Sequence, residues 1–128
     1  MDLLSITPNT TFLALKHPAT GEDIGVTVEL RSLESDEVKA VERMIKNKAL
    51  KGGRNTVTAE KIDDNAAAIL SAAIVSWSFS GDANLGGDKN PACNDANKRK
   101  LLSVPPIAKQ IDQALGDETA FFASSANG

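Results

Sequence analysis

The side chains that could support catalysis are few in this 128-residue chain, and none stands in an arrangement typical of an active site. The single histidine, His17, precedes Pro18 in a stretch typical of a turn, so a serine–histidine–aspartate triad would depend on this residue alone. Asp63 and Asp64 are adjacent. On a helix they would point about 100° apart, so they suit the first turn of a helix better than a facing acid–base pair. We therefore predict that the protein is not an enzyme.

Cys93 is the only cysteine, which excludes an internal disulfide and a cysteine-based zinc cluster. No histidine lies near it in the sequence, and the closest basic run is at residues 98–100. Cysteine reactivity requires neighbours that stabilise the thiolate. We therefore interpret Cys93 as a loop thiol without a chemical role.

A calcium loop is the metal motif that the sequence matches in part. In residues 82–93, Asp82, Asn84 and Gly87 occupy EF-hand positions 1, 3 and 6. Glycine stands at position 5, and Cys93 stands where the bidentate glutamate should be. The strongest ligand is missing, so we predict neither a metal nor a cofactor.

The charge and hydropathy favour neither nucleic acid nor a membrane as a partner. The formal net charge is −3, whereas nucleic-acid-binding domains carry a basic face. We interpret the basic run at 98–100 as a solvated helix face in preference to a nucleic-acid site.

The apolar run at 66–75 is shorter than the roughly 20 residues of a membrane-spanning helix. Residues 1–10 lack the features of a signal peptide, so we expect a soluble protein that stays in the cytoplasm.

Two stretches with strand patterns follow the first ten residues. Residues 11–16 form a short apolar run, and residues 17–23 contain the proline and glycine of a turn. Between 24 and 30, apolar residues alternate with small or polar ones, which is typical of a half-buried strand. The sequence therefore predicts an antiparallel hairpin.

Helical periodicity replaces this alternation after residue 35. A first amphipathic helix is predicted over 35–51, with acidic residues at its start and lysines at its end. A second helix is predicted from Thr58 to Trp77. It is apolar on most sides, so we expect it to be the buried central helix, with Trp77 as a core anchor at its end. The alternative is that one flank stays open for a partner. The main apolar stripe consists of Ile62, Ala66, Ile69, Leu70, Ala73 and Trp77.

The C-terminal part is predicted to be a long loop followed by short helices. Residues 79–95 are rich in glycine and asparagine and lack periodicity, as functional or mobile loops do. Asn94 or Asp95 would start a helix that Pro105 ends, and Pro106 would start the next one.

The predicted fold class is α+β, with an N-terminal β-hairpin packed on a mainly helical domain of four to five helices. We interpret residues 1–10 as an N-terminal arm, 11–122 as a single globular domain and 123–128 as a flexible tail.

Four sequence features, each present once, follow one another along residues 11–122. They are the turn HPATGE at 17–22, the pair Ser35-Asp36, Trp77, and a C-terminal pattern. The C-terminal pattern consists of Asp95-Ala96-Asn97, Leu101-Leu102, Pro105, Ile107, Ile111 and Phe121-Phe122. This order resembles that of the tail assembly chaperones of long-tailed, siphovirus-type bacteriophages and prophages. His17 stands where an aspartate is common in that family.

The resemblance implies a non-enzymatic function as a late protein in viral tail assembly. Such chaperones bind the phage tape measure protein, keep its apolar stretches soluble and help to recruit tail tube subunits. They act in the host cytoplasm and are generally absent from the mature virion. In many relatives a ribosomal frameshift adds a C-terminal extension. The alternative is a structural virion protein of the head–tail connector or tail-completion type.

The apolar C-terminal segment is the predicted partner-binding surface, with Leu101, Ile107, Phe121 and Phe122 as the candidate contact residues. Adjacent residues on a helix cannot both face one core. One of the two phenylalanines would therefore point outward, toward a partner or a second copy of the chain. The face of the 35–51 helix is the next candidate surface.

Overall fold

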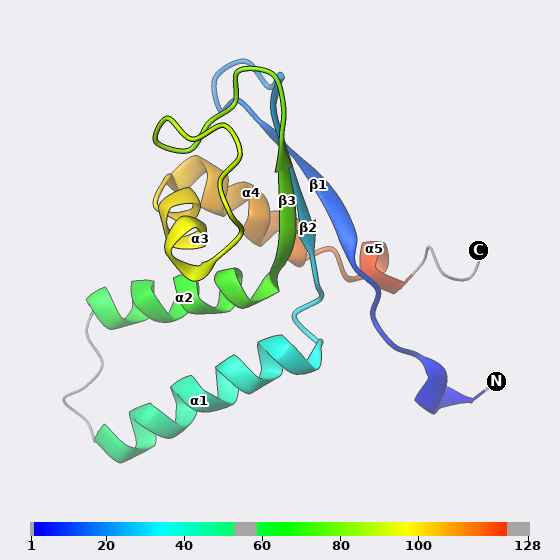
Figure 1. Cartoon of the computed structure of the whole chain (residues 1–128). Helices are drawn as coiled ribbons and strands as arrows, with labels where there is room; N and C mark the ends of the chain where they lie inside the picture. The colour runs from blue at the N-terminus through cyan, green and yellow to red at the C-terminus, as the bar shows by residue number, and fades with distance from the viewer. Residues whose placement is uncertain (1, 53–58, 123–128) are drawn as a thin grey trace.

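The computed structural model describes residues 2–52 and 59–122 and has an α+β architecture (Figure 1). A three-stranded antiparallel sheet, in the order β1-β2-β3, packs against helices, which confirms the predicted fold class. The elements in chain order are η1 (Leu3–Ser5), β1 (Thr11–Lys16), β2 (Asp23–Leu30), α1 (Asp36–Gly52), α2 (Ala59–Ala73), β3 (Ile74–Phe79), α3 (Asp95–Leu102), α4 (Pro105–Leu115) and α5 (Glu118–Phe122).

The predicted hairpin is formed by β1 and β2, which pair antiparallel with Leu13 opposite Val28. The alternation along β2 places Val26, Val28 and Leu30 in the core. The turn closes through the amide of His17, which donates to the Glu22 carbonyl oxygen at 2.8 Å. The alternating pattern therefore identified both the strand and its buried face.

The third strand is a correction to the sequence prediction. We predicted a helix through Trp77, whereas α2 ends at Ala73 and β3 begins at Ile74. β3 pairs antiparallel with β2, with Trp77 opposite Val28. The stretch from Ile74 to Phe79 starts with two β-branched residues and then alternates serine with an aromatic ring, a composition that fits a pleated strand. The helical spacing of Trp77 with the preceding alanines and isoleucines was coincidental.

Trp77 is therefore a sheet residue, and it is partly rather than fully buried. Its indole N–H donates to the Pro91 carbonyl oxygen at 2.9 Å. The ring meets that of Phe79, two residues along the strand, edge to face, with 5.8 Å between the centroids. Trp77 thus joins β3 to the loop that precedes α3.

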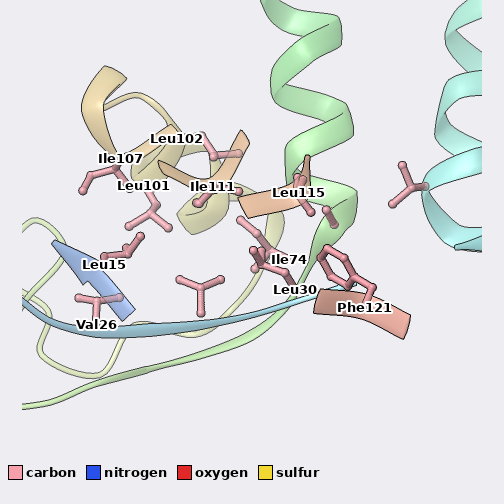
Figure 2. Packing of buried hydrophobic residues seen from close by; sticks show 13 residues of the cluster. Leu15, Val26, Leu30, Ile74, Leu101, Leu102, Ile107, Ile111, Leu115 and Phe121 are labelled. Carbon is pink, nitrogen blue, oxygen red and sulfur yellow. The ribbon is translucent and has the colours of Figure 1, made fainter. Parts of the chain in front are cut away.

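The core lies between one face of the sheet and the C-terminal helices (Figure 2). α3 begins at an Asn94 cap, whose side-chain oxygen accepts the Asn97 amide at 2.9 Å, and Pro105 begins α4. Both starts agree with the predicted boundaries to within one residue. The buried hydrophobic residues are Leu15, Val26, Val28, Leu30, Val38, Ala73, Ile74, Leu101, Leu102, Ile107, Ile111, Leu115 and Phe121.

The chain between β2 and β3 contains α1 and α2, which pack against each other. α1 matches the predicted helix, and its Val38 reaches the core. The prediction that α2 is buried on most sides is wrong. Ala73 is buried, but Ala66 is exposed and Ile69 and Leu70 are only partly buried. α1 lies along one side of α2 and α3 along another (Figure 1). Ala66, Ile69 and Leu70 nevertheless keep accessible surface.

Candidate functional site: an apolar groove between α2 and α4

The side chains first considered for chemistry do not meet in the fold. His17 is an exposed turn residue whose Nδ1 accepts the Ala19 amide at 3.1 Å. Asp64 is exposed on α2, and the side chain of Asp63 lies outside the described residues. Burial raises the pKa of the Cys93 thiol above its ordinary value, against the opposing charge of Lys98, so the reactive thiolate is disfavoured.

Polar side chains of the calcium-like loop, residues 82–93, accept hydrogen bonds from backbone amides of the loop itself. The Asn84 side-chain oxygen accepts the Gly87 amide at 2.9 Å, and the Asp88 carboxylate accepts the Asn90 amide at 2.9 Å. Within residues 2–52 and 59–122, no group of three or more histidine, cysteine or acidic side chains is arranged to hold a metal ion. In the same ranges, no helix combines the length and apolarity needed to cross a membrane.

The four residues predicted to contact a partner are mostly covered in this fold, and Figure 2 shows three of them, Leu101, Ile107 and Phe121, within the core. Phe121 is fully buried, and Leu101 and Ile107 are each about 6% exposed. Phe122 is partly buried at the edge of the same core. The two phenylalanines do face differently, as their adjacency required. Only Phe122 keeps a partly accessible side chain, and its contact with a partner stays a prediction.

An apolar groove lies elsewhere, between α2 and α4. We name it the α2–α4 groove; its volume is about 410 Å³. Its lining residues are Leu33, Ala66, Ile69, Leu70, Ala108, Lys109 and Asp112. Leu33, from the connection between β2 and α1, packs with Ile69 and Leu70 against the main core. These three residues, which we call the floor of the groove, are therefore continuous with the hydrophobic core.

The walls of the α2–α4 groove combine small apolar residues with two charges. Ala66 on α2 and Ala108 on α4 leave room for another backbone to approach closely. Lys109 and Asp112 stand three residues apart on α4, and both are exposed. The groove thus offers an apolar bottom with one positive and one negative charge on its α4 side.

Further apolar side chains are exposed away from the groove. In the arm, here residues 2–10, Leu3 is 74% and Leu4 is 89% exposed. Phe12 on β1 is 69% exposed, and Met44 and Leu50 on α1 are 54% and 75% exposed. Single exposed apolar residues are common on protein surfaces. The arm differs because its apolar residues are consecutive.

The sequence placed Ala66, Ile69 and Leu70 correctly on one helix face but assigned that face to the core. Their spacing of i, i+3 and i+4 is the same whether a face is covered or open. The alternative interpretation, in which one flank of this helix stays open for a partner, was the part of the sequence prediction that pointed to the groove. Leu33 and Ala108 carried no such signal, because they join the groove only through tertiary packing.

Comparison with known proteins adds no relative: no protein-family model, curated protein or solved structure matches the chain. A proposal about function therefore rests on the order of motifs in the sequence and on the geometry of the described residues, in particular the α2–α4 groove.

Proposed function

We propose that the protein is a non-enzymatic tail assembly chaperone of a long-tailed phage or prophage. In this proposal it binds apolar helical stretches of the tape measure protein, keeps them soluble and helps to recruit tail tube subunits. It acts in the host cytoplasm and is absent from the mature virion. Two features support the proposal: the order of motifs along residues 11–122 and the α2–α4 groove.

The groove is the observation that carries the proposal. A helix that docks in a groove presents apolar side chains at i, i+3, i+4 and i+7. Ile69 and Leu70 offer an apolar floor for such side chains, and Ala66 and Ala108 leave space for the client backbone. A groove of about 410 Å³ admits a few large side chains at a time, which suits repeated capture along a long apolar client.

The charges fit a client that is apolar on one face and polar on the other. Lys109 and Asp112 lie beside the apolar floor and can pair with charges that flank the apolar stripe of an amphipathic helix. The net charge of −3 favours solubility of the complex. The groove would therefore cover the client's apolar face while leaving its polar face in water.

The test is co-purification and affinity with an apolar tape measure segment from the same phage or prophage. Ala66→Glu places a charge in the α2–α4 groove without removing a core side chain. We expect it to raise the client's dissociation constant at least about tenfold, or about 1.4 kcal/mol. Ala96→Glu makes the same change at an exposed position on α3, outside the groove, and is the matched control.

Circular dichroism and the melting temperature check that both variants are folded. If Ala66→Glu binds the client as well as Ala96→Glu does, the groove is not the client site. Phe122→Ser then tests the surface predicted from the sequence. If the protein is found in purified virions, the structural virion protein replaces the chaperone as the proposed function.

A further inference from the structure

The arm exposes a short apolar segment. Leu3, Leu4 and Ile6 are 74%, 89% and 49% exposed, and η1 holds Leu3 and Leu4 in one turn. Asp2 begins this turn, since its carboxylate accepts the Leu4 amide at 3.0 Å. Three large exposed apolar side chains thus lie within four positions of the chain. The arm therefore presents apolar side chains next to the acidic Asp2.

The base of the arm is held away from the α2–α4 groove. The Asn9 amide donates to the Phe121 carbonyl oxygen at 2.7 Å, which fixes the arm beside α5. From there the arm runs outward, away from α2 and α4 (Figure 1). Its apolar residues consequently do not cover the groove of their own chain in this structure.

The arm and the groove are complementary in chemistry. The groove has an apolar floor of Leu33, Ile69 and Leu70, and Lys109 stands at its side. A docked arm would place its leucines on that floor. Asp2 would lie toward Lys109 and away from Asp112, so the two charges set the direction in which the arm binds.

We propose that the arm of one copy docks in the α2–α4 groove of a second copy of this chain. If two copies exchange arms reciprocally, both arms and both grooves are covered in a closed dimer. The inference deepens the proposed function, because it assigns to the same groove an internal occupant that a client must displace. Self-association can nevertheless be measured without any client.

The first experiment measures molar mass against concentration by size-exclusion chromatography with light scattering. The full chain is expected to form a dimer whose dissociation constant rises at least about tenfold in a Leu3→Ser/Leu4→Ser variant. Phe12→Ser removes an apolar side chain outside the arm that is 69% exposed, and it should leave the dimer intact. A monomer at all concentrations, or a dimer that the arm variant leaves unchanged, overturns the proposal.

The second experiment tests the direction of docking by charge reversal. Asp2→Lys and Lys109→Glu should each weaken the dimer. The double variant should be weakened by less than the sum of the two losses, because the pair is then re-formed with opposite signs, although Asp2→Lys also removes the cap on the Leu4 amide. These residues are exposed, so the variants are expected to fold, which circular dichroism checks. Additive weakening in the double variant would show that the two residues do not meet, and would overturn the docking direction proposed here.

The third experiment separates this inference from the proposed function. A peptide of residues 2–9 is added to the client complex of the Leu3→Ser/Leu4→Ser protein. Release of the client by this peptide, but not by a peptide with Leu3 and Leu4 replaced by serine, supports one shared groove. Failure of the peptide to compete, with client binding still lost in Ala66→Glu, overturns arm docking alone. Dimerisation through the arm without any client binding overturns the proposed function alone.

Discussion

At the residue scale, Glu29 forms the best-defined polar cluster outside the core. Its carboxylate accepts hydrogen bonds from the Thr10 hydroxyl at 2.7 Å and from the Ser76 hydroxyl at 2.9 Å. Together with the Arg31 charge, these bonds hold the pKa of Glu29 below its ordinary value, with the Thr10 bond the largest cause. One carboxylate thus joins β2 to β3 and to the segment before β1.

This lowered pKa predicts a pH-dependent contribution to stability. Folding favours the ionised form of Glu29. Its contribution to the free energy of unfolding is therefore present above the ordinary glutamate pKa of about 4.3 and is lost as the pH falls through the lowered pKa of the folded protein. Glu29→Gln should melt below the wild type at pH 7, and the difference should shrink toward pH 3. Thermal melts followed by circular dichroism between pH 3 and 7 measure it. Glu22→Gln, at the exposed hairpin turn, is the control, and a difference that grows toward acid pH would contradict the assignment.

At the element scale, β2 depends on one glycine for its close contact with the chain after β3. Gly25 has φ +86°, and a Cβ there would lie 2.6 Å from the Ser80 carbonyl oxygen. The Ser80 amide donates to the Gly25 carbonyl oxygen at 2.8 Å, so the two backbones are held together at this point. An alanine would be strained by its backbone angle and would also force the strands apart.

Gly25→Ala is therefore expected to destabilise the protein by roughly 2–4 kcal/mol, from backbone strain and the steric clash together. Gly86→Ala is the matched control, because Gly86 also has a positive φ, +61°, but a Cβ there meets nothing within 4 Å. Urea unfolding measures the loss of stability in both variants. In Gly86→Ala the loss comes from backbone strain alone, and in Gly25→Ala it comes from strain and the steric clash together. Equal losses in the two variants would show that the contact with Ser80 carries no cost.

The junction between α2 and β3 shows how two elements share one continuous apolar run. The Arg31 amide donates to the Ala73 carbonyl oxygen at 2.8 Å, which ties the end of α2 to the end of β2. Beyond this point Ile74 pairs with Leu30 and the chain continues as a strand. A long apolar stretch can therefore change structure in its middle when a neighbouring strand offers backbone partners.

At the scale of the whole molecule, the described residues form a sheet-and-helix body from which α1 and α2 extend (Figure 1). α1 reaches the core through Val38 near its start, while Met44 and Leu50 are exposed further along. Apolar burial thus decreases along α1 away from the sheet. Regions with little buried apolar contact open at lower free energy than the core.

Amide hydrogen exchange should reveal this gradient. We expect amides at residues 44–48 of α1 to exchange at least about tenfold faster than those at 26–30 of β2, because α1 opens locally while β2 requires global unfolding. Exchange measured by mass spectrometry or NMR checks the ratio. The buried segment of α4 around Ile111 should behave like β2 and serves as the internal control. Equal protection of α1 and β2 would contradict the gradient.

The sequence by itself determined the elements whose signals are local. The hairpin follows from the short apolar run at 11–16 and the period-two alternation at 24–30, joined by a turn with Pro18 and Gly21. The start of α3 follows from the Asn94 cap, and that of α4 from its prolines. Each of these signals depends on residues within a few positions of one another, so no distant contact was needed to interpret them.

Only the tertiary structure decided where apolar surface is covered and where it is open. Ile74–Phe79, whose composition also fits a strand, leaves the helix and pairs with β2, which supplies its hydrogen-bonding partners. Phe121 and Leu101, predicted contact residues, were buried by the packing of the C-terminal helices on the sheet. Ala66, with neighbours predicted to be core, was left at the open groove. Periodicity shows which face of an element is apolar, but burial depends on which distant segments pack against that face, and only the complete fold brings those segments together.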